Sequence, residues 1–229
     1  MTRRALFVTG TDTDVGKTHV AVALLRALAD SGVRAAAMKP VAAGIDPHTR
    51  RHADVDALMA AAGVDAPRDE VNPYGFAEAI APHVAARRAS RTIDLAVIEQ
   101  RFAALAARAD VVIVEGAGGA LVPLADRIDM LDIPARLGLP VVLVVGVRLG
   151  CINHALLSAL AIRARGLTLA GWIANRIDPA MANADDSIAA ITDRLGIAAA
   201  ADVAFAQQQI GGAALVALGV GGVAAIAPV

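Results

Sequence analysis

Short runs of apolar residues alternate along this chain with longer segments in which apolar residues recur at helical spacing. The runs contain no polar residue, and such strands are typical of parallel sheets buried on both faces. This alternation predicts an α/β fold, with a mainly parallel central sheet, helices on both faces and a single domain over residues 1–229. We expect strands at residues 5–8, 35–38, 111–114, 141–147 and 169–174, and helices at about 18–29, 93–109, 150–164 and 184–195.

The region between the second and third predicted strands carries weaker signals. Gly44 and Pro47 predict a loop over residues 42–51. We expect a short helix from about 54 to 63. Residues 72–76 have the composition of a turn.

The last part of the chain differs in composition. No charged residue follows Asp202, and residues 210–229 form an apolar, glycine-rich run of transmembrane length. Its glycines and the lack of flanking lysine or arginine argue against a membrane span. We therefore expect buried or poorly defined terminal structure over about 203–229.

A glycine-rich turn joins the first predicted strand to the first predicted helix. Residues 10–18 resemble the phosphate-binding pattern G-x-x-x-x-G-K-[ST], although Thr11 stands where the pattern has glycine. Backbone N–H groups at the start of a helix bind phosphate, and Lys17 would reach the outer phosphates. The hydroxyl of Thr18 is placed to ligate Mg²⁺. A chance glycine turn is the alternative, but the order strand, Gly-Lys-Thr, helix favours a phosphate-binding loop.

Composition narrows the classes of function. A net charge of −1 and an aromatic content of 3% disfavour nucleic-acid binding. The single cysteine, Cys151, excludes an intramolecular disulfide and suits a reducing compartment. The first strand begins so early that we expect no signal peptide. We therefore expect a cytoplasmic protein that binds neither nucleic acid nor membrane.

Lysine is scarce in this chain. Of 21 basic residues only two are lysines, Lys17 and Lys39. A bias toward arginine explains the majority but not the two exceptions, one of which lies in the phosphate-binding turn. A lysine ammonium is a compact point charge that arginine does not replace in a tight turn. Lys39 follows the second predicted strand, and strand ends of a parallel sheet meet at one edge, so we expect Lys39 beside the phosphate-binding loop.

Polar residues also stand at the ends of later strands. Glu115 ends the third predicted strand and precedes glycines, which is the Walker B arrangement for Mg²⁺ or its water. Asn175 ends the last predicted strand and could read an adenine edge or be a turn residue. Asp54 and Asp56 could serve Mg²⁺, but acids also favour a helix N-terminus, and the residues alone favour that explanation.

Six segments in this order resemble the dethiobiotin synthetase family, and the resemblance covers roughly residues 5–178. The segments are residues 10–18 (GTDTDVGKT), 39–44 (KPVAAG), 72–74 (NPY), 114–119 (VEGAGG), 145–154 (VGVRLGCINH) and 170–175 (AGWIAN).

The resemblance implies a P-loop protein with a mainly parallel seven-stranded sheet that works as a homodimer. It implies an ATP- and Mg²⁺-dependent ligase of biotin biosynthesis, which closes the ureido ring of dethiobiotin from 7,8-diaminononanoate and CO₂. In that reaction one substrate amine forms a carbamate, and ATP converts the carbamate to a carbamic–phosphoric anhydride. The second amine then attacks the anhydride, and phosphate leaves.

The resemblance also implies roles for individual residues. The implied catalytic residues are Lys17, Lys39 and Thr13, and the implied ligands of Mg²⁺ are Thr18, Asp54 and Glu115. The implied ATP contacts are Asp14, Val15, Gly16, Lys17, Thr18, Glu115, Gly118 and Asn175. The implied substrate contacts are Thr13, Lys39, Ala43, Leu149, Gly150, Cys151 and Asn153, of which the last four would receive the carboxylate tail of a substrate bound to the partner subunit.

Three positions and one segment depart from the family pattern. The family often has glutamate at Asp14, serine at Ala43 and asparagine at His52, and the last change leaves open whether Asp54 or Asp56 binds the metal. Residues 198–206 lack the proline of the family's Gly-x-Ile-Pro-like segment. That segment contributes to the nucleotide site, so nucleotide selectivity could be relaxed.

Two other protein classes share the phosphate-binding loop. A partition- or septum-positioning switch ATPase carries a second lysine early in the loop, where this chain has residues 11–13 without lysine. A cobyrinate synthetase of the amidotransferase type needs a glutaminase domain, for which 229 residues are too few. We therefore prefer the interpretation that the chain is similar to dethiobiotin synthetases, with the switch ATPase as the alternative.

Overall fold

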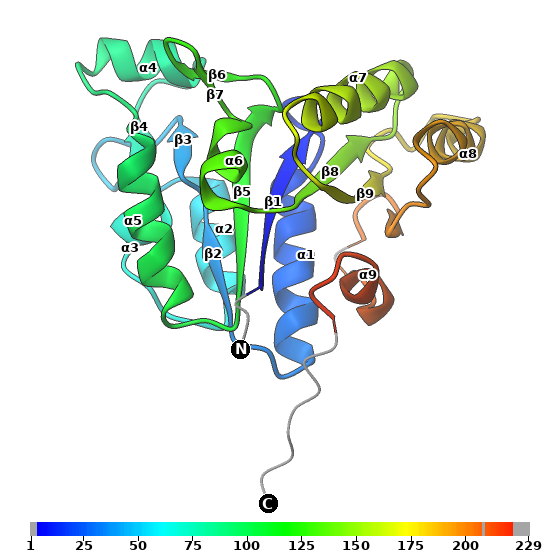
Figure 1. The fold of residues 1–229 in the computed structure, drawn as a ribbon, viewed down its shortest axis with the longest axis horizontal. Coiled ribbons are helices and arrows are strands. Elements are labelled where there is room, and N and C mark those ends of the chain that lie inside the picture. The colour runs from blue at the N-terminus through cyan, green and yellow to red at the C-terminus, as the bar shows by residue number, and fades with distance from the viewer. Residues whose placement is uncertain (1–3, 208, 222–229) are drawn as a thin grey trace, which may run out of the picture.

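Six parallel strands form the central sheet, in the order β10-β9-β8-β1-β5-β2 (Figure 1). The computed structural model describes residues 4–207 and 209–221. The six strands are β1 (Arg4–Gly10), β2 (Ala35–Met38), β5 (Val111–Gly119), β8 (Val141–Gly146), β9 (Leu169–Asn175) and β10 (Ala201–Val203).

Two small two-stranded sheets and a set of helices surround the central sheet. The small sheets pair β3 (Val41–Ala43) with β4 (Tyr74–Phe76), and β6 (Pro123–Ala125) with β7 (Ile128–Asp129). The helices are α1 (Lys17–Asp30), α2 (Ala53–Ala61), α3 (Arg68–Val71), α4 (Pro82–Arg88), α5 (Leu95–Ala106), α6 (Asp132–Leu137), α7 (Cys151–Ala164), α8 (Ala184–Leu195) and α9 (Gly212–Ala217).

Successive residues of the strands face two separate cores, because side chains alternate between the faces of a sheet. Phe7 packs in a core with Ile98 of α5 and Ala155 of α7. Its neighbour Leu6 packs on the other face in a core with Leu24 of α1. Both cores are needed to bury the all-apolar strands, which confirms the predicted α/β fold with helices on both faces.

The parallel arrangement brings the ends of several strands to one edge of the sheet. β1 leads into the phosphate-binding loop, and β2 leads directly to Lys39. Glu115 lies within β5, which separates β1 from β2 in the sheet. Asn175 is the last residue of β9.

Most predicted elements are confirmed. The strand at 35–38 and the helix at 184–195 have the predicted bounds, and the remaining predicted strands and long helices differ by a few residues at their ends. The third strand is longer than predicted, since β5 continues through Gly119, which pairs with Gly10 of β1.

The predictions of a loop at residues 42–51 and a turn at 72–76 are wrong in part, because each range overlaps a short strand. Val41 to Ala43 pairs in parallel with Tyr74 to Phe76, so a short strand begins the predicted loop and another lies in the predicted turn. Strands of three residues are too short to show an alternating pattern. The strands of the β6–β7 hairpin are also this short, and the helices α4 and α6 are too short to show a helical period. The sequence therefore predicted none of them.

The C-terminal part contains ordered structure that the sequence left open. β10 pairs with β9, and α9 buries Ala214 and Leu215 in the core that contains α1. Residues 222–229, the end of the predicted terminal segment, lie outside the described residues. Within 4–207 and 209–221 the central sheet has six strands, rather than the seven that the family resemblance implies. None of the helices described there is long and apolar enough to cross a membrane.

Candidate active site

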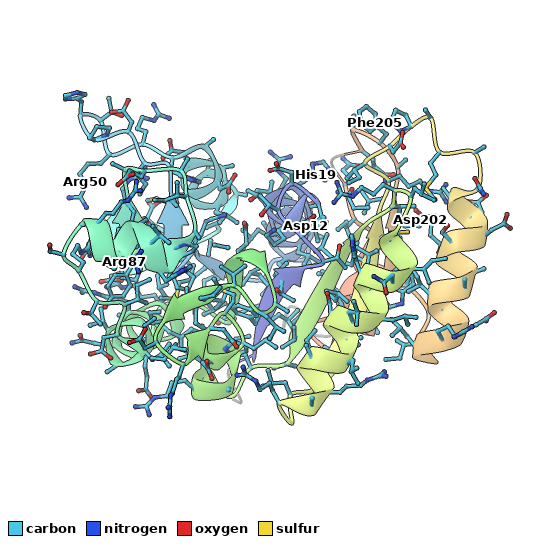
Figure 2. All side chains as sticks on the ribbon, turned by 90° about the horizontal axis from the view of Figure 1, so that it is seen from above. Asp12, His19, Arg50, Arg87, Asp202 and Phe205 are labelled. Atoms are coloured by element: carbon cyan, nitrogen blue, oxygen red, sulfur yellow. The ribbon has the colours of Figure 1, made fainter. Side chains whose placement is uncertain are left out.

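A cleft of about 780 Å³ opens at the carboxyl edge of the sheet, above β1, β5 and β2. Figure 2 looks down on this edge, with Asp12 of the phosphate-binding loop near the centre. The cleft is lined by Thr13, Asp14, Gly16, Lys17, Thr18, Lys39, Ala42, Ala43, His52, Asp54, Ala79, Ile80, Ala81, Pro82, Glu115, Ala117, Gly118 and Val122.

The phosphate-binding loop enters α1 through a left-handed glycine. Gly16 has φ of 84° and lies against the side chain of Asn175. The Asn175 amide donates to the Val15 carbonyl at 2.9 Å. A Cβ atom at Gly16 would lie 2.1 Å from the Asn175 nitrogen, so this close approach requires glycine. The strand-end asparagine is therefore attached to the loop, and its amide is oriented by a carbonyl that can only accept.

Lys17 lies at the base of the cleft with 7% of its surface exposed. Its ammonium donates to the backbone carbonyl of Asp12 at 2.7 Å. Burial lowers the pKa of Lys17, although the Glu115 carboxylate acts in the opposite direction. The lysine thus forms a hydrogen bond back to the loop that precedes it.

Lys39 joins two carboxylates. Its ammonium lies 2.6 Å from Glu115 Oε1 and 2.5 Å from Asp54 Oδ2, and the side chain is almost fully buried. Burial alone would lower the pKa of Lys39, but the charges of Glu115 and Asp54 outweigh burial and raise it. Burial likewise acts to raise the pKa of Asp54, and the ammonium of Lys39 holds it below its usual value. Lys39 and Asp54 are therefore both charged at neutral pH.

Three oxygen-bearing side chains at this point fit a hard divalent cation. Thr18 Oγ1 donates to Glu115 Oε1 at 2.7 Å. The Asp54 carboxylate lies near them, because it accepts a hydrogen bond from the Lys39 ammonium, which also donates to Glu115 Oε1. Glu115 Oε2 is buried and has no hydrogen-bond partner among the described residues. Two carboxylates and a hydroxyl suit Mg²⁺, which keeps several waters and takes phosphate oxygens as further ligands. A cluster of three or more His, Cys, Asp or Glu side chains that could hold a metal is absent from the described part of the chain.

The structure distinguishes the two aspartates of α2. Asp56 forms ion pairs with Arg51 and Arg68, which tie the start of α2 to its surroundings. Asp54 lines the cleft, and Asp56 does not. This geometry favours Asp54 as the metal ligand, the choice that the sequence left open.

Four further residues expected at the site also line the cleft, whereas Val15 and Asn175 are not among its lining residues. Thr13, Asp14, Ala43 and Gly118 lie on its wall. Gly118 has φ of 64°, and a Cβ atom there would lie 2.7 Å from Val122. These residues are brought together as expected, whereas the contribution of Ala79–Pro82 to the wall had no sequence signal.

The segment expected to receive a substrate tail lies away from the cleft of its own chain. Leu149, Gly150, Cys151 and Asn153 are not among the lining residues. Leu149 is 92% exposed, whereas Cys151 is buried at the start of α7.

An ion pair that the sequence did not predict joins this segment to the phosphate-binding loop. Arg148, which precedes Leu149, binds the Asp12 carboxylate at 2.7 Å. Both side chains are about half exposed, so the pair contributes little to stability. No local pattern in the sequence connects two residues so far apart along the chain.

Comparisons with known proteins find a matching family model and relatives of high identity. A family model described as an AAA domain matches residues 4–208. ATP-dependent dethiobiotin synthetase BioD of Aromatoleum aromaticum is 55% identical over 194 residues, which cover 84% of this chain and 86% of the relative. The protein of the same name from Nitrosospira multiformis is 53% identical over 192 residues, which cover 84% of each.

A solved structure shares the fold at much lower identity. The ParA family ATPase from Chlorobium tepidum TLS has a TM-score of 0.54 and 14% identity, covering 96% of this chain and 90% of that chain. This likeness concerns the fold alone.

We predict that Gly16→Ala destabilises the protein more than Gly196→Ala. Both glycines have left-handed backbones, but no atom of the residues that the structure describes lies within 4 Å of a Cβ atom at Gly196. The control should therefore lose only the cost of a left-handed alanine, about 1–2 kcal/mol. Gly16→Ala must also displace the Asn175 amide from the Val15 carbonyl, which adds about 1–3 kcal/mol. Urea unfolding of both variants measures the difference, and equal losses would contradict the packing described for Asn175.

Proposed function

This chain belongs to the dethiobiotin synthetase family, and on that premise we propose that it is an ATP-dependent ligase that closes the ureido ring of dethiobiotin. Its substrates would be 7,8-diaminononanoate, CO₂ and ATP, and its products dethiobiotin, ADP and phosphate. The observation that carries the proposal is the pairing of the buried Lys39 with Glu115 and Asp54 beside the phosphate-binding loop. A hydrolytic P-loop site has no evident need for this second lysine.

The reaction concentrates negative charge at the loop. One amine of the diamine attacks CO₂ and loses a proton, which gives a carbamate. A carbamate oxygen attacks the terminal phosphorus of ATP, ADP leaves, and a carbamic–phosphoric anhydride forms. The second amine then attacks the carbamoyl carbon, and the ring closes as phosphate leaves with the loss of one proton. Lys17 and Lys39 would stabilise the charge that develops on the phosphoryl and carbamate oxygens.

The loop side of the cleft would hold ATP. The contacts proposed for the phosphates are the backbone of residues 14–16 with Lys17 and Thr18, because N–H groups at a helix start bind phosphate. Gly118 would line the same space, and Asn175 would recognise adenine with the part of its amide that does not contact Val15. Thr13 and Ala43 would lie beside the reacting end of the diamine.

Mg²⁺ would be held by Thr18, Asp54 and Glu115, and when bound it would neutralise charge on the transferring phosphoryl group. The buried Glu115 Oε2, which has no hydrogen-bond partner in the described part of the chain, supports this assignment.

A homodimer would complete the substrate site. Leu149, Leu157 and Leu160 expose large apolar side chains at and along α7, and contiguous exposed apolar surface marks interaction sites. We propose that a second copy covers this face. The start of α7, with Gly150, Cys151 and Asn153, would then bind the carboxylate tail of a diamine whose amines lie in the partner's cleft. A cytoplasmic location is part of the same proposal and is supported by the single cysteine.

Mixing the protein with 7,8-diaminononanoate, bicarbonate, Mg²⁺ and ATP tests the proposed reaction. We expect dethiobiotin by mass spectrometry, with one phosphate released per ring closed. ATP hydrolysis that does not depend on the diamine, without dethiobiotin, would favour the switch ATPase instead.

We predict that Lys39→Gln leaves ATP affinity largely intact but lowers dethiobiotin formation at least about a hundredfold, the scale of removing one oxyanion donor. Glutamine keeps a polar group but not the charge that the carbamate and phosphoryl oxygens need. Lys39→Arg should restore little, because its planar guanidinium is larger and directs its donors differently. Calorimetry with ATP and product formation at saturating diamine measure the two effects. A wild-type rate for Lys39→Gln would remove Lys39 from the mechanism.

We predict that two inactive variants complement each other in a mixed dimer. A heterodimer of Lys17→Ala and Asn153→Trp subunits would contain one site with an intact loop and an intact tail segment. A mixture of Lys17→Ala and Lys39→Gln is the matched control, because both defects lie on the loop side and leave no intact site. Activity after subunit exchange is the measurement. If the first mixture regains no more activity than the control, each site is built from a single chain.

A further inference from the structure

The backbone around Lys39 is held by a segment that does not line the cleft. The Lys39 N–H donates to the Val71 carbonyl at 2.8 Å, and the Tyr74 N–H donates to the Pro40 carbonyl at 3.1 Å. Lys39 and Pro40 are the two residues between β2 and β3, so the two bonds hold the connection between these strands. Residues 71–74 therefore act as a support for the turn that carries Lys39.

Asn72 completes this support with its side chain. Its amide nitrogen donates to the Lys39 carbonyl at 2.7 Å and lies 3.5 Å from the Tyr74 carbonyl. The residue is buried, with 6% of its surface exposed. Because a backbone carbonyl can only accept, the amide nitrogen must face Lys39. The amide oxygen faces Gly75 instead, where a Cβ atom would lie 3.0 Å from it.

The position of the Lys39 backbone determines where its ammonium can lie. The ammonium is within hydrogen-bond distance of Glu115 and Asp54 at the same time. A shift of the Lys39 Cα would move the ammonium away from this position. Small misplacements of a reacting or charge-stabilising group are costly to catalysis, on the order of a hundredfold for about 1 Å.

We propose that Asn72 is a positioning residue, which fixes the backbone of Lys39 so that its ammonium meets the reacting carbamate and phosphoryl oxygens. The inference rests on the proposed function in assigning that task to Lys39. Of the two carbonyls near the Asn72 amide, only that of Lys39 belongs to a residue proposed to act in the reaction, and Asn72 is not among the residues that line the cleft. Its effect on the reaction must therefore disappear when the Lys39 ammonium is absent.

A double-mutant cycle with Lys39→Gln tests this dependence. Asn72→Asp keeps the size of the side chain and removes the donor, and Asn72→Ser removes most of the amide. In the wild-type background we expect each to lower kcat about tenfold or more, with KM for ATP within about twofold of wild type. In the Lys39→Gln background the same changes should alter the rate less than about twofold, because residues that act as a unit are not additive.

Tyr74→Phe is the matched control. It removes the hydrogen bond at 2.9 Å that the Tyr74 hydroxyl accepts from the Asp94 N–H, in the same segment but without contact to Lys39. We expect a lower melting temperature with kcat close to wild type.

The outcomes distinguish a failure of the positioning role of Asn72 from a failure of the proposed function. The positioning role would be overturned if the effects of the Asn72 and Lys39 substitutions multiply, or if folded Asn72→Asp has a wild-type kcat. It would also be overturned if Tyr74→Phe lowers kcat as much as Asn72→Asp does. Failure of both Asn72 variants to fold would show that Asn72 serves the fold, and would also overturn it. Absence of dethiobiotin from the wild-type protein would instead contradict the proposed function.

Discussion

Two lysine ammonium groups and two carboxylates share one cleft, and the rest of the site depends on the balance of their charges. Glu115 is fully buried, and a buried carboxylate without a partner would destabilise the protein by several kcal/mol. Lys39 supplies the opposite charge and Thr18 supplies a hydrogen bond. The opposite charges of Lys39 and Glu115 therefore offset much of the cost of burying either group alone.

The order of strands in the sheet places these groups next to one another. β1, β5 and β2 are neighbours, and they carry the phosphate-binding loop, Glu115 and the turn with Lys39 respectively. β9 lies beyond β8 on the other side of β1, so Asn175 reaches the loop from the opposite direction. A parallel sheet brings all these ends to one edge, and the side chains that line the cleft need no long loops to meet.

The sequence predicted the parts of this arrangement that depend on local patterns. The apolar strands, the phosphate-binding loop and the strand-end position of Glu115 follow from periodicity and from residue order. The scarcity of lysine singled out Lys39, and the structure places it beside Glu115. The parallel pairing of Val41 with Tyr74 and the ion pair of Arg148 with Asp12 could not be predicted, because each joins segments far apart in the chain. Asn72 was assigned to a turn, since nothing in the sequence indicates which carbonyl its amide would meet.

Lys39 has two carboxylate partners, so an anionic substrate gains little from its ammonium unless those carboxylates interact with another cation. At an effective dielectric of ~20, unit charges ~4 Å apart interact by about 4 kcal/mol, and two carboxylates stabilise the ammonium more than one carbamate would. The partners of Lys39, Asp54 and Glu115, are also the residues proposed to hold Mg²⁺. A carboxylate that ligates a divalent cation is a weaker partner for an ammonium group. Metal binding and capture of the carbamate by Lys39 would therefore favour each other, while the backbone of Lys39 stays where residues 71–74 hold it.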